Sequence, residues 1–171
     1  MRIARKESRR ARGRRSEAVI LFAVGSATFA IAAQAVDEIR STQGLCPLQL
    51  PAGHSHLAKV RYTLERGSRT FYVVDMARHF RVIETAPNRI LLLRGVPVAL
   101  LVAGVDRMTE IVSVRALPRA FRGEERRWYR GLALVGDQVV PVVNPEAFLS
   151  RAEQMVLGAA LEESPLELVF T

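Results

Sequence analysis

The chain has 171 residues, of which 49% are hydrophobic and 25% are charged. This composition is that of a globular protein and excludes a largely disordered one, and the length suffices for one domain or two small lobes. The net charge of +8 is uneven, because residues 1–15 hold eight basic and one acidic side chain while the remainder is close to neutral. We therefore expect residues 1–15 to form a disordered basic arm that the fold does not need, although such an arm can also contact nucleic acid or anionic lipid.

The apolar segment at residues 18–33 has two interpretations. It follows the basic arm and precedes Ala33-Gln34-Ala35, and this arrangement is typical of a secretory signal peptide with a small-residue cleavage site. The segment is also split at Gly25-Ser26 into two short apolar runs, as in a β-hairpin. The segment alone leaves both interpretations open.

Strand patterns dominate the rest of the chain. Residues 59–65 alternate between apolar and polar side chains, which indicates a half-buried strand that turns at residues 66–68 and returns over residues 69–74. Residues 89–103 contain two apolar runs separated by Arg94-Gly95-Val96, which predicts a hairpin buried on both faces. Residues 131–143 predict another hairpin, with a turn at Gly136-Asp137.

The two halves of the chain follow a similar plan. Val73-Val74-Asp75 and Val142-Val143-Asn144 each predict a strand end followed by a capping residue and a short helix, and each half begins with a hairpin. This repetition predicts a mainly β protein with two small five-stranded β-barrel lobes, at about residues 16–86 and 87–157. It also favours a retained hairpin at residues 18–33, since a lobe without it loses half of its strands.

The last predicted element is a C-terminal helix. Asn144 is a suitable cap, Pro145 fits the first helical position, and Gly158 is a plausible stop. The residues expected on its buried face are Phe148, Leu149, Ala152, Met155 and Val156. Residues 158–171 would then form a C-terminal tail.

The sequence contains no pattern that indicates an enzyme. Phosphate-binding loops, dinucleotide-binding glycine patterns, nucleophile elbows and paired-cysteine metal sites are all absent from it. His54 and His56 lack a recognisable third ligand nearby and are expected to be ordinary loop residues. The single cysteine, Cys46, excludes an internal disulfide and favours a reducing, cytoplasmic location. We therefore predict no catalytic residues, no cofactor, no metal and no membrane span.

Several short motifs, in order along residues 17–157, resemble the CheW family of chemotaxis coupling proteins. They are Ile20-Leu21-Phe22-Ala23-Val24-Gly25, Thr28-Phe29-Ala30-Ile31, Val36-Asp37-Glu38-Ile39, Leu64-Glu65-Arg66-Gly67, Val73-Val74-Asp75-Met76, Leu101-Val102-Ala103-Gly104-Val105-Asp106 and the closing hairpin over residues 131–144. The basic arm and residues 159–171 lie outside this pattern. The resemblance implies two five-stranded barrels and no catalysis.

The same resemblance implies a signalling adaptor that joins the cytoplasmic tip of a chemoreceptor to the regulatory domain of a histidine kinase. Carried over by motif, the partner-binding residues are Val36, Glu38 and Arg66. Two alternatives stay open. One is a nucleic-acid-binding β-barrel protein that uses the basic arm and the aromatic segment around Trp128, which the near-neutral body disfavours. The other is an exported barrel protein.

Overall fold

The computed structural model describes residues 15–163 except residues 51, 84 and 85. The predicted disordered arm, apart from residue 15, and residues 164–171 of the predicted tail therefore lie outside the described residues. Among the described residues, no helix combines the length and the apolar character needed to cross a membrane.

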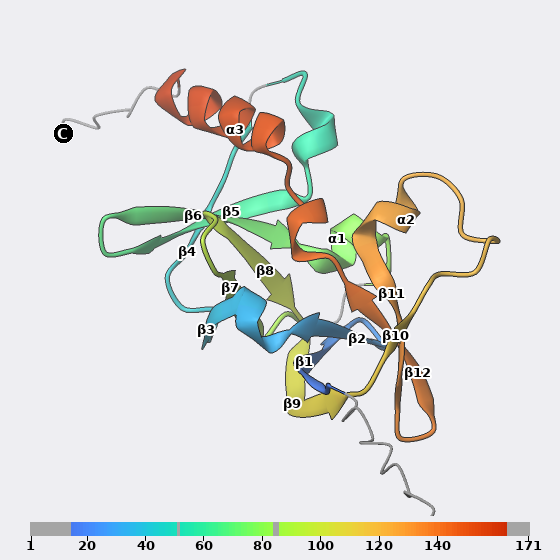
Figure 1. Ribbon diagram of the computed structural model, residues 1–171. Coiled ribbons are helices and arrows are strands. Elements are labelled where there is room, and N and C mark those ends of the chain that lie inside the picture. Colours follow the sequence, from blue (N-terminus) through green and yellow to red (C-terminus); the bar gives the residue numbers. More distant parts are fainter. Residues whose placement is uncertain (1–14, 51, 84–85, 164–171) are drawn as a thin grey trace, which may run out of the picture.

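Two six-stranded sheets form the molecule (Figure 1). Sheet A has the strand order β10-β11-β12-β2-β1-β9, and its strands are β1 (Glu17–Val24), β2 (Ala27–Ala32), β9 (Gly104–Ile111), β10 (Val114–Arg115), β11 (Tyr129–Val135) and β12 (Gln138–Val143). Sheet B has the order β3-β7-β8-β6-β5-β4, and its strands are β3 (Val36–Arg40), β4 (Leu45–Pro47), β5 (Val60–Arg66), β6 (Arg69–Asp75), β7 (Arg89–Leu93) and β8 (Val98–Val102). The prediction of a mainly β protein is confirmed.

The prediction of closed barrels is wrong, because each sheet is open. In sheet A the end strands β9 and β10 are not neighbours, and in sheet B the end strands β3 and β4 are not neighbours. One end strand of each sheet is very short, with two residues in β10 and three in β4. Such strands offer too few backbone groups to complete a ring of hydrogen bonds.

The predicted hairpins exist, and the first hairpin of each half of the chain belongs to the sheet formed mainly by the other half. Residues 18–33 form most of β1 and all of β2, which pair antiparallel from Val19–Ala32 to Val24–Ala27 in the interior of sheet A. The hairpin β7–β8 occupies the equivalent place in sheet B. Each sheet thus takes its hairpin from one half of the chain and its other four strands from the other half. The sheets therefore do not follow the expected division at residues 86 and 87.

The repeated strand-and-cap pattern is confirmed in both halves. At the end of β6, Asp75 Oδ1 accepts hydrogen bonds from the backbone N–H groups of Ala77 (3.1 Å) and Arg78 (3.4 Å), and α1 (Met76–Phe80) begins there. At the end of β12, Asn144 Oδ1 accepts a hydrogen bond from the N–H of Glu146 (3.3 Å) and opens the short 3₁₀ helix η3 (Pro145–Ala147). Satisfying free N–H groups at a helix start is the usual role of Asp and Asn there.

The C-terminal helix begins and ends later than predicted. The helix α3 spans Arg151–Glu163 and continues past Gly158. It starts anew at Ser150, because Ser150 Oγ accepts a hydrogen bond from the N–H of Glu153 (3.1 Å) while Glu153 Oε2 accepts one from the N–H of Ser150 (2.7 Å). This capping box starts a new helix, so its buried face differs from that of a helix continuing from Pro145. Leu157 and Ala160 are therefore buried, while Met155, expected on the buried face, is 77% exposed.

Three clusters of buried side chains hold the sheets together. One cluster lies within sheet A and includes Val19, Ala30 and Val142, and another lies within sheet B and includes Phe71 and Leu101. The largest cluster joins the two sheets and contains residues of both exchanged hairpins, together with Phe148 and Leu157. The short elements at its margin are η1 (Ala33–Ala35), η2 (Ser55–Leu57) and α2 (Glu125–Trp128). Figure 1 shows α2 beside β11 and α3 beyond β5 and β6.

Candidate partner-binding site

The edge strand β3 carries two of the three predicted site residues, and a β-bulge shapes it. The register shifts between Val36, which pairs with Leu93, and Glu38, which pairs with Leu92. Asp37 is the extra residue in this bulge. Successive side chains of a regular strand point to opposite faces, whereas a bulge redirects one of them. The bulge therefore lets Asp37 and Glu38 reach the same neighbour.

That neighbour is Arg66, the third predicted residue. It ends β5 immediately before the turn at Gly67-Ser68, where Gly67 has a φ of +61° that side chains rarely allow. Arg66 Nη1 lies 2.9 Å from Asp37 Oδ2, and Arg66 Nε lies 2.9 Å from Glu38 Oε2. One guanidinium group thus binds two carboxylates that lie 28 and 29 residues away in the sequence.

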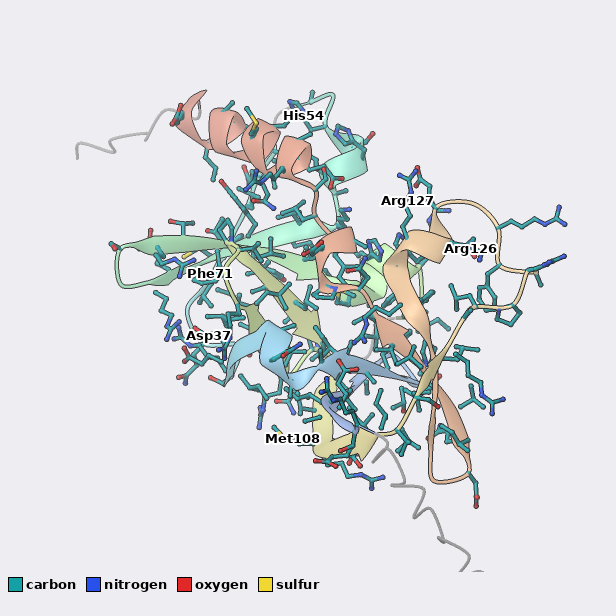
Figure 2. The ribbon with its side chains drawn as sticks, in the orientation of Figure 1. Asp37, His54, Phe71, Met108, Arg126 and Arg127 are labelled. Atoms are coloured by element: carbon teal, nitrogen blue, oxygen red, sulfur yellow. The ribbon has the colours of Figure 1, made fainter. Side chains whose placement is uncertain are left out.

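Two further arginines complete the group. Arg94 Nη2 lies 3.8 Å from Asp37 Oδ1 and donates a hydrogen bond to the carbonyl of Val36 at 3.4 Å, and Arg40 Nε lies 3.7 Å from Glu38 Oε1. We call the five side chains the Arg66 cluster; its members are Asp37, Glu38, Arg40, Arg66 and Arg94. Three cations and two carboxylates give it a net charge of +1. Figure 2 shows Asp37 at the margin of the molecule beside β3.

The cluster is accessible to a partner. Side-chain exposure is 42% for Arg66, 39% for Asp37 and 35% for Glu38. The side chain of Ile39, which alternates to the other face of β3, is 42% exposed and gives the edge strand an apolar surface beside the cluster. A guanidinium group has five N–H donors in a planar fork, and its two ion pairs here engage Nη1 and Nε. The arrangement suits recognition of carboxylates or backbone carbonyls and has no evident reactive group.

Val36 occupies a different position from the other two predicted residues. Its side chain is 7% exposed and belongs to the cluster that joins the two sheets. Its backbone carbonyl accepts the hydrogen bond from Arg94. Val36 therefore positions the strand, and its side chain offers little surface to a partner.

The sequence reasoning missed Asp37, Arg40 and Arg94. Asp37 and Arg40 flank residues that the motif had already singled out, so the adjacent charges were a usable signal. Arg94 lies in the turn between β7 and β8, and no local pattern connects that turn with β3. Only the pairing of β3 with β7 brings Arg94 to this site.

The other candidate segments have structural roles or carry no site. The ring of Trp128 is 4.4 Å from that of His79 and 5.7 Å from that of Phe80, so it packs against α1 instead of standing free for base stacking. Cys46 is exposed in β4. Within residues 15–163, gaps aside, no group of three or more His, Cys, Asp or Glu side chains is placed to hold a metal ion.

With this geometry described, comparison with known proteins identifies the kind of domain. The sequence matches the model of the CheW-like domain over residues 18–153. The crystal structure of the scaffolding protein TtCheW from Thermoanaerobacter tengcongensis is similar, with a TM-score of 0.68 and 14% sequence identity, over 83% of this chain and 99% of that chain. No curated protein matches the sequence. Because the family match covers most of the chain, the protein belongs to the family of CheW-like domains.

Proposed function

We propose that this protein is a non-enzymatic chemosensory adaptor that joins the cytoplasmic tip of a chemoreceptor to the regulatory domain of a histidine kinase in the cytoplasm. Family membership and the fold shared with a scaffolding protein support this role. The observation that carries it is the Arg66 cluster, which presents preorganised charges and an exposed apolar side chain on an edge strand. An adaptor needs such accessible recognition groups and has no need of a catalytic centre.

The cluster provides a physical route to reversible binding. The ion pairs of Arg66 are more than one-third exposed, so solvent screens them and each contributes little to folding. A partner carboxylate can therefore replace Asp37 at the guanidinium group of Arg66 at small cost, while Glu38 continues to hold the guanidinium group in place through Nε. Exclusion of water by the partner then strengthens the new pair.

The nucleic-acid alternative has weaker support. The aromatic segment proposed for base stacking is packed against α1 through Trp128. The net charge of the chain without residues 1–15 is only +1, whereas affinity for a phosphate backbone needs a broad positive surface.

Isothermal titration calorimetry tests the adaptor role. The full chain is titrated separately with the kinase regulatory domain and with the receptor cytoplasmic fragment from its own host, and a double-stranded DNA fragment serves as the comparison. We expect saturable binding to both proteins and no binding to DNA at physiological salt. If neither protein binds, the adaptor role is wrong.

A further inference from the structure

A second surface feature lies on the opposite end of β5 from Arg66. The strand β4 pairs with β5 from Leu45–Leu64 to Pro47–Tyr62, and one more backbone hydrogen bond follows, from the N–H of Leu48 to the carbonyl of Arg61 at 2.8 Å. The chain then leaves β5 and returns to it only at residue 60. A groove of about 640 Å³ occupies the space between this segment and β5.

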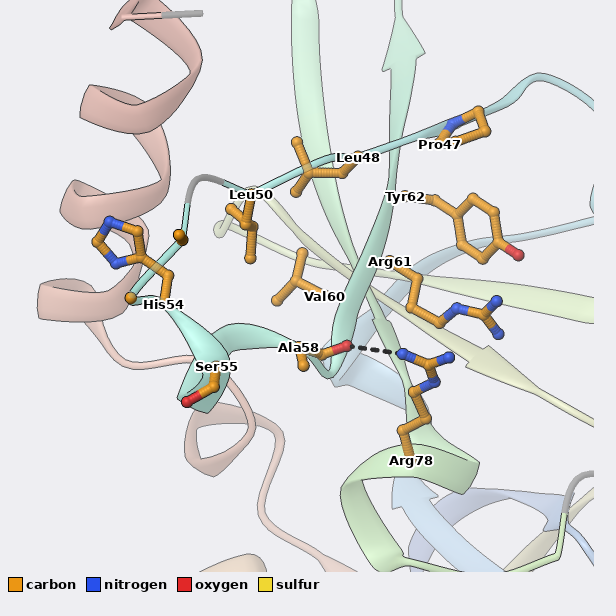
Figure 3. A pocket seen from close by; sticks show the side chains of 12 residues that line it. Pro47, Leu48, Leu50, His54, Ser55, Ala58, Val60, Arg61, Tyr62 and Arg78 are labelled. Atoms are coloured by element: carbon orange, nitrogen blue, oxygen red, sulfur yellow. Dashed lines mark hydrogen bonds between the residues drawn. The ribbon is translucent and has the colours of Figure 1, made fainter.

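The groove has an apolar wall and a cationic end. Leu48 and Leu50 form the apolar wall above the buried Val60, and the guanidinium groups of Arg61 and Arg78 lie together at one end (Figure 3). None of the described residues that line it is an aspartate or glutamate. The local charge therefore favours an anionic group next to an apolar one.

Local contacts orient both arginines. Arg61 Nη1 lies 3.2 Å from Oδ2 of the buried Asp75, and the Arg61 guanidinium carbon lies 5.4 Å from the centre of the Tyr62 ring. Arg78 Nη1 donates a long hydrogen bond of 3.5 Å to the carbonyl of Ala58 across the groove (Figure 3). Because Asp75 already neutralises part of the charge of Arg61, Arg78 is the principal cation for a ligand.

We propose that this groove is a second docking site, which binds a short extended segment of a partner protein that has an aspartate or glutamate between apolar residues. The carboxylate binds at Arg78, and the neighbouring apolar side chains pack on the partly exposed Leu48 and Leu50. Arg66 lies six residues along the strand from Val60, or about 20 Å, so the groove and the Arg66 cluster are separate surfaces. The inference goes beyond the adaptor role and does not depend on the identity of the kinase or receptor.

The test uses fluorescence anisotropy with the full chain and three fluorescein-labelled peptides. Their sequences are Ser-Leu-Glu-Leu-Ser, Ser-Leu-Gln-Leu-Ser and Ser-Ser-Glu-Ser-Ser. We expect the first peptide to bind about fivefold more tightly than either of the others, as one partly exposed charge pair or a small apolar contact predicts. The Arg78→Ala variant should bind the first two peptides equally. Alanine is a good helix former, so this variant should fold normally.

Arg107→Ala is the matched control. It removes the same charge from the exposed strand β9 of sheet A, away from the groove. It should retain the preference for the glutamate peptide. The proposal is overturned if the wild type shows no preference, if Arg78→Ala keeps it, or if Arg107→Ala loses it equally. Absence of binding by all three peptides up to about 1 mM also overturns it, since that limit corresponds to a negligible affinity.

Discussion

Arg66 Nε and Glu38 Oε2 lie 2.9 Å apart although their strands stand far from each other in the hydrogen-bonded order of sheet B. β3 is the first strand of that order and β5 is the fifth. The ion pair therefore shows that sheet B curls until its two ends approach. No backbone hydrogen bonds join β3 to β5, and side chains bridge the gap between them. In sheet A, apolar packing performs this task, because Val135 at the equivalent turn packs against the buried cluster that contains Ile111 of β9.

We expect replacement of Arg66 by alanine to lower the free energy of unfolding by no more than about 1 kcal/mol, because its ion pairs are substantially exposed. Urea denaturation measures this change. Arg66→Lys is the control, since it retains the charge and loses the planar fork. A loss of several kcal/mol in Arg66→Ala would show that the cluster is a structural element of the fold, contrary to this account.

The Ser150 cap should matter more for stability. Ser150→Ala removes the hydroxyl group that satisfies the N–H of Glu153 at the start of α3. The expected cost is about 1 kcal/mol in urea denaturation, with faster hydrogen exchange in the first turn of α3. Ser68→Ala, in the exposed turn between β5 and β6, should change stability by less than about 0.5 kcal/mol. Equal effects of the two substitutions would exclude the capping role.

His79 should make stability depend on pH. Burial among aromatic rings and the nearby charge of Lys59 lower the pKa of His79 from 6.5 to about 4, against the opposing effect of Glu153. Between these values the unfolded chain binds a proton that the folded chain does not. The contribution of His79 to the free energy of unfolding is therefore complete above pH 6.5 and is lost as the pH falls toward 4. Among the residues that the structure describes, none makes a hydrogen bond to the buried Nε2 atom, which is consistent with a neutral ring.

The His79→Gln variant tests this dependence, because glutamine does not titrate. Chemical denaturation from pH 4 to 7 should give a shallower slope for the variant than for the wild type. His56→Gln, at an exposed position, is the control and should retain the wild-type slope. If His79→Gln and wild type have the same slope, His79 does not cause the dependence.

The hairpin at residues 18–33 should be present in the mature protein. β1 and β2 are inner strands of sheet A, and Phe22 and Ile31 are completely buried in the cluster that joins the sheets. We expect Phe22→Ala to cost about 3–5 kcal/mol, as for other large core truncations, whereas Met108→Ala, at 64% exposure, should cost little. Intact-mass measurement of protein from the native host tests retention. A mature chain that starts near Val36 would contradict it.

The sequence predicted the local elements better than their assembly. Hairpins, caps and the alternation in β5 depend on neighbouring residues, so they could be read directly. The exchange of hairpins between sheets depends on the pairing of β6 with β8 and of β2 with β12, which have no local signature. The predicted bounds of the C-terminal helix are wrong at both ends, because the Ser150–Glu153 capping box starts α3 and the helix continues through Gly158 to Glu163. The same holds for the candidate site. Short motifs predicted Glu38 and Arg66, whereas only the tertiary structure places Arg94 beside them.

The most direct test of the central claim compares partner binding by wild type, Arg66→Ala, Glu38→Ala and the charge-matched control Arg107→Ala in titration calorimetry. The titrants are the kinase regulatory domain and the receptor cytoplasmic fragment. We predict that Arg66→Ala weakens binding of at least one of them about tenfold, which corresponds to the loss of one charged hydrogen-bonded pair, and that Glu38→Ala also weakens it. Arg107→Ala should bind like the wild type. If Arg66→Ala and Glu38→Ala both retain wild-type affinity for both partners, the Arg66 cluster is not the partner-binding site.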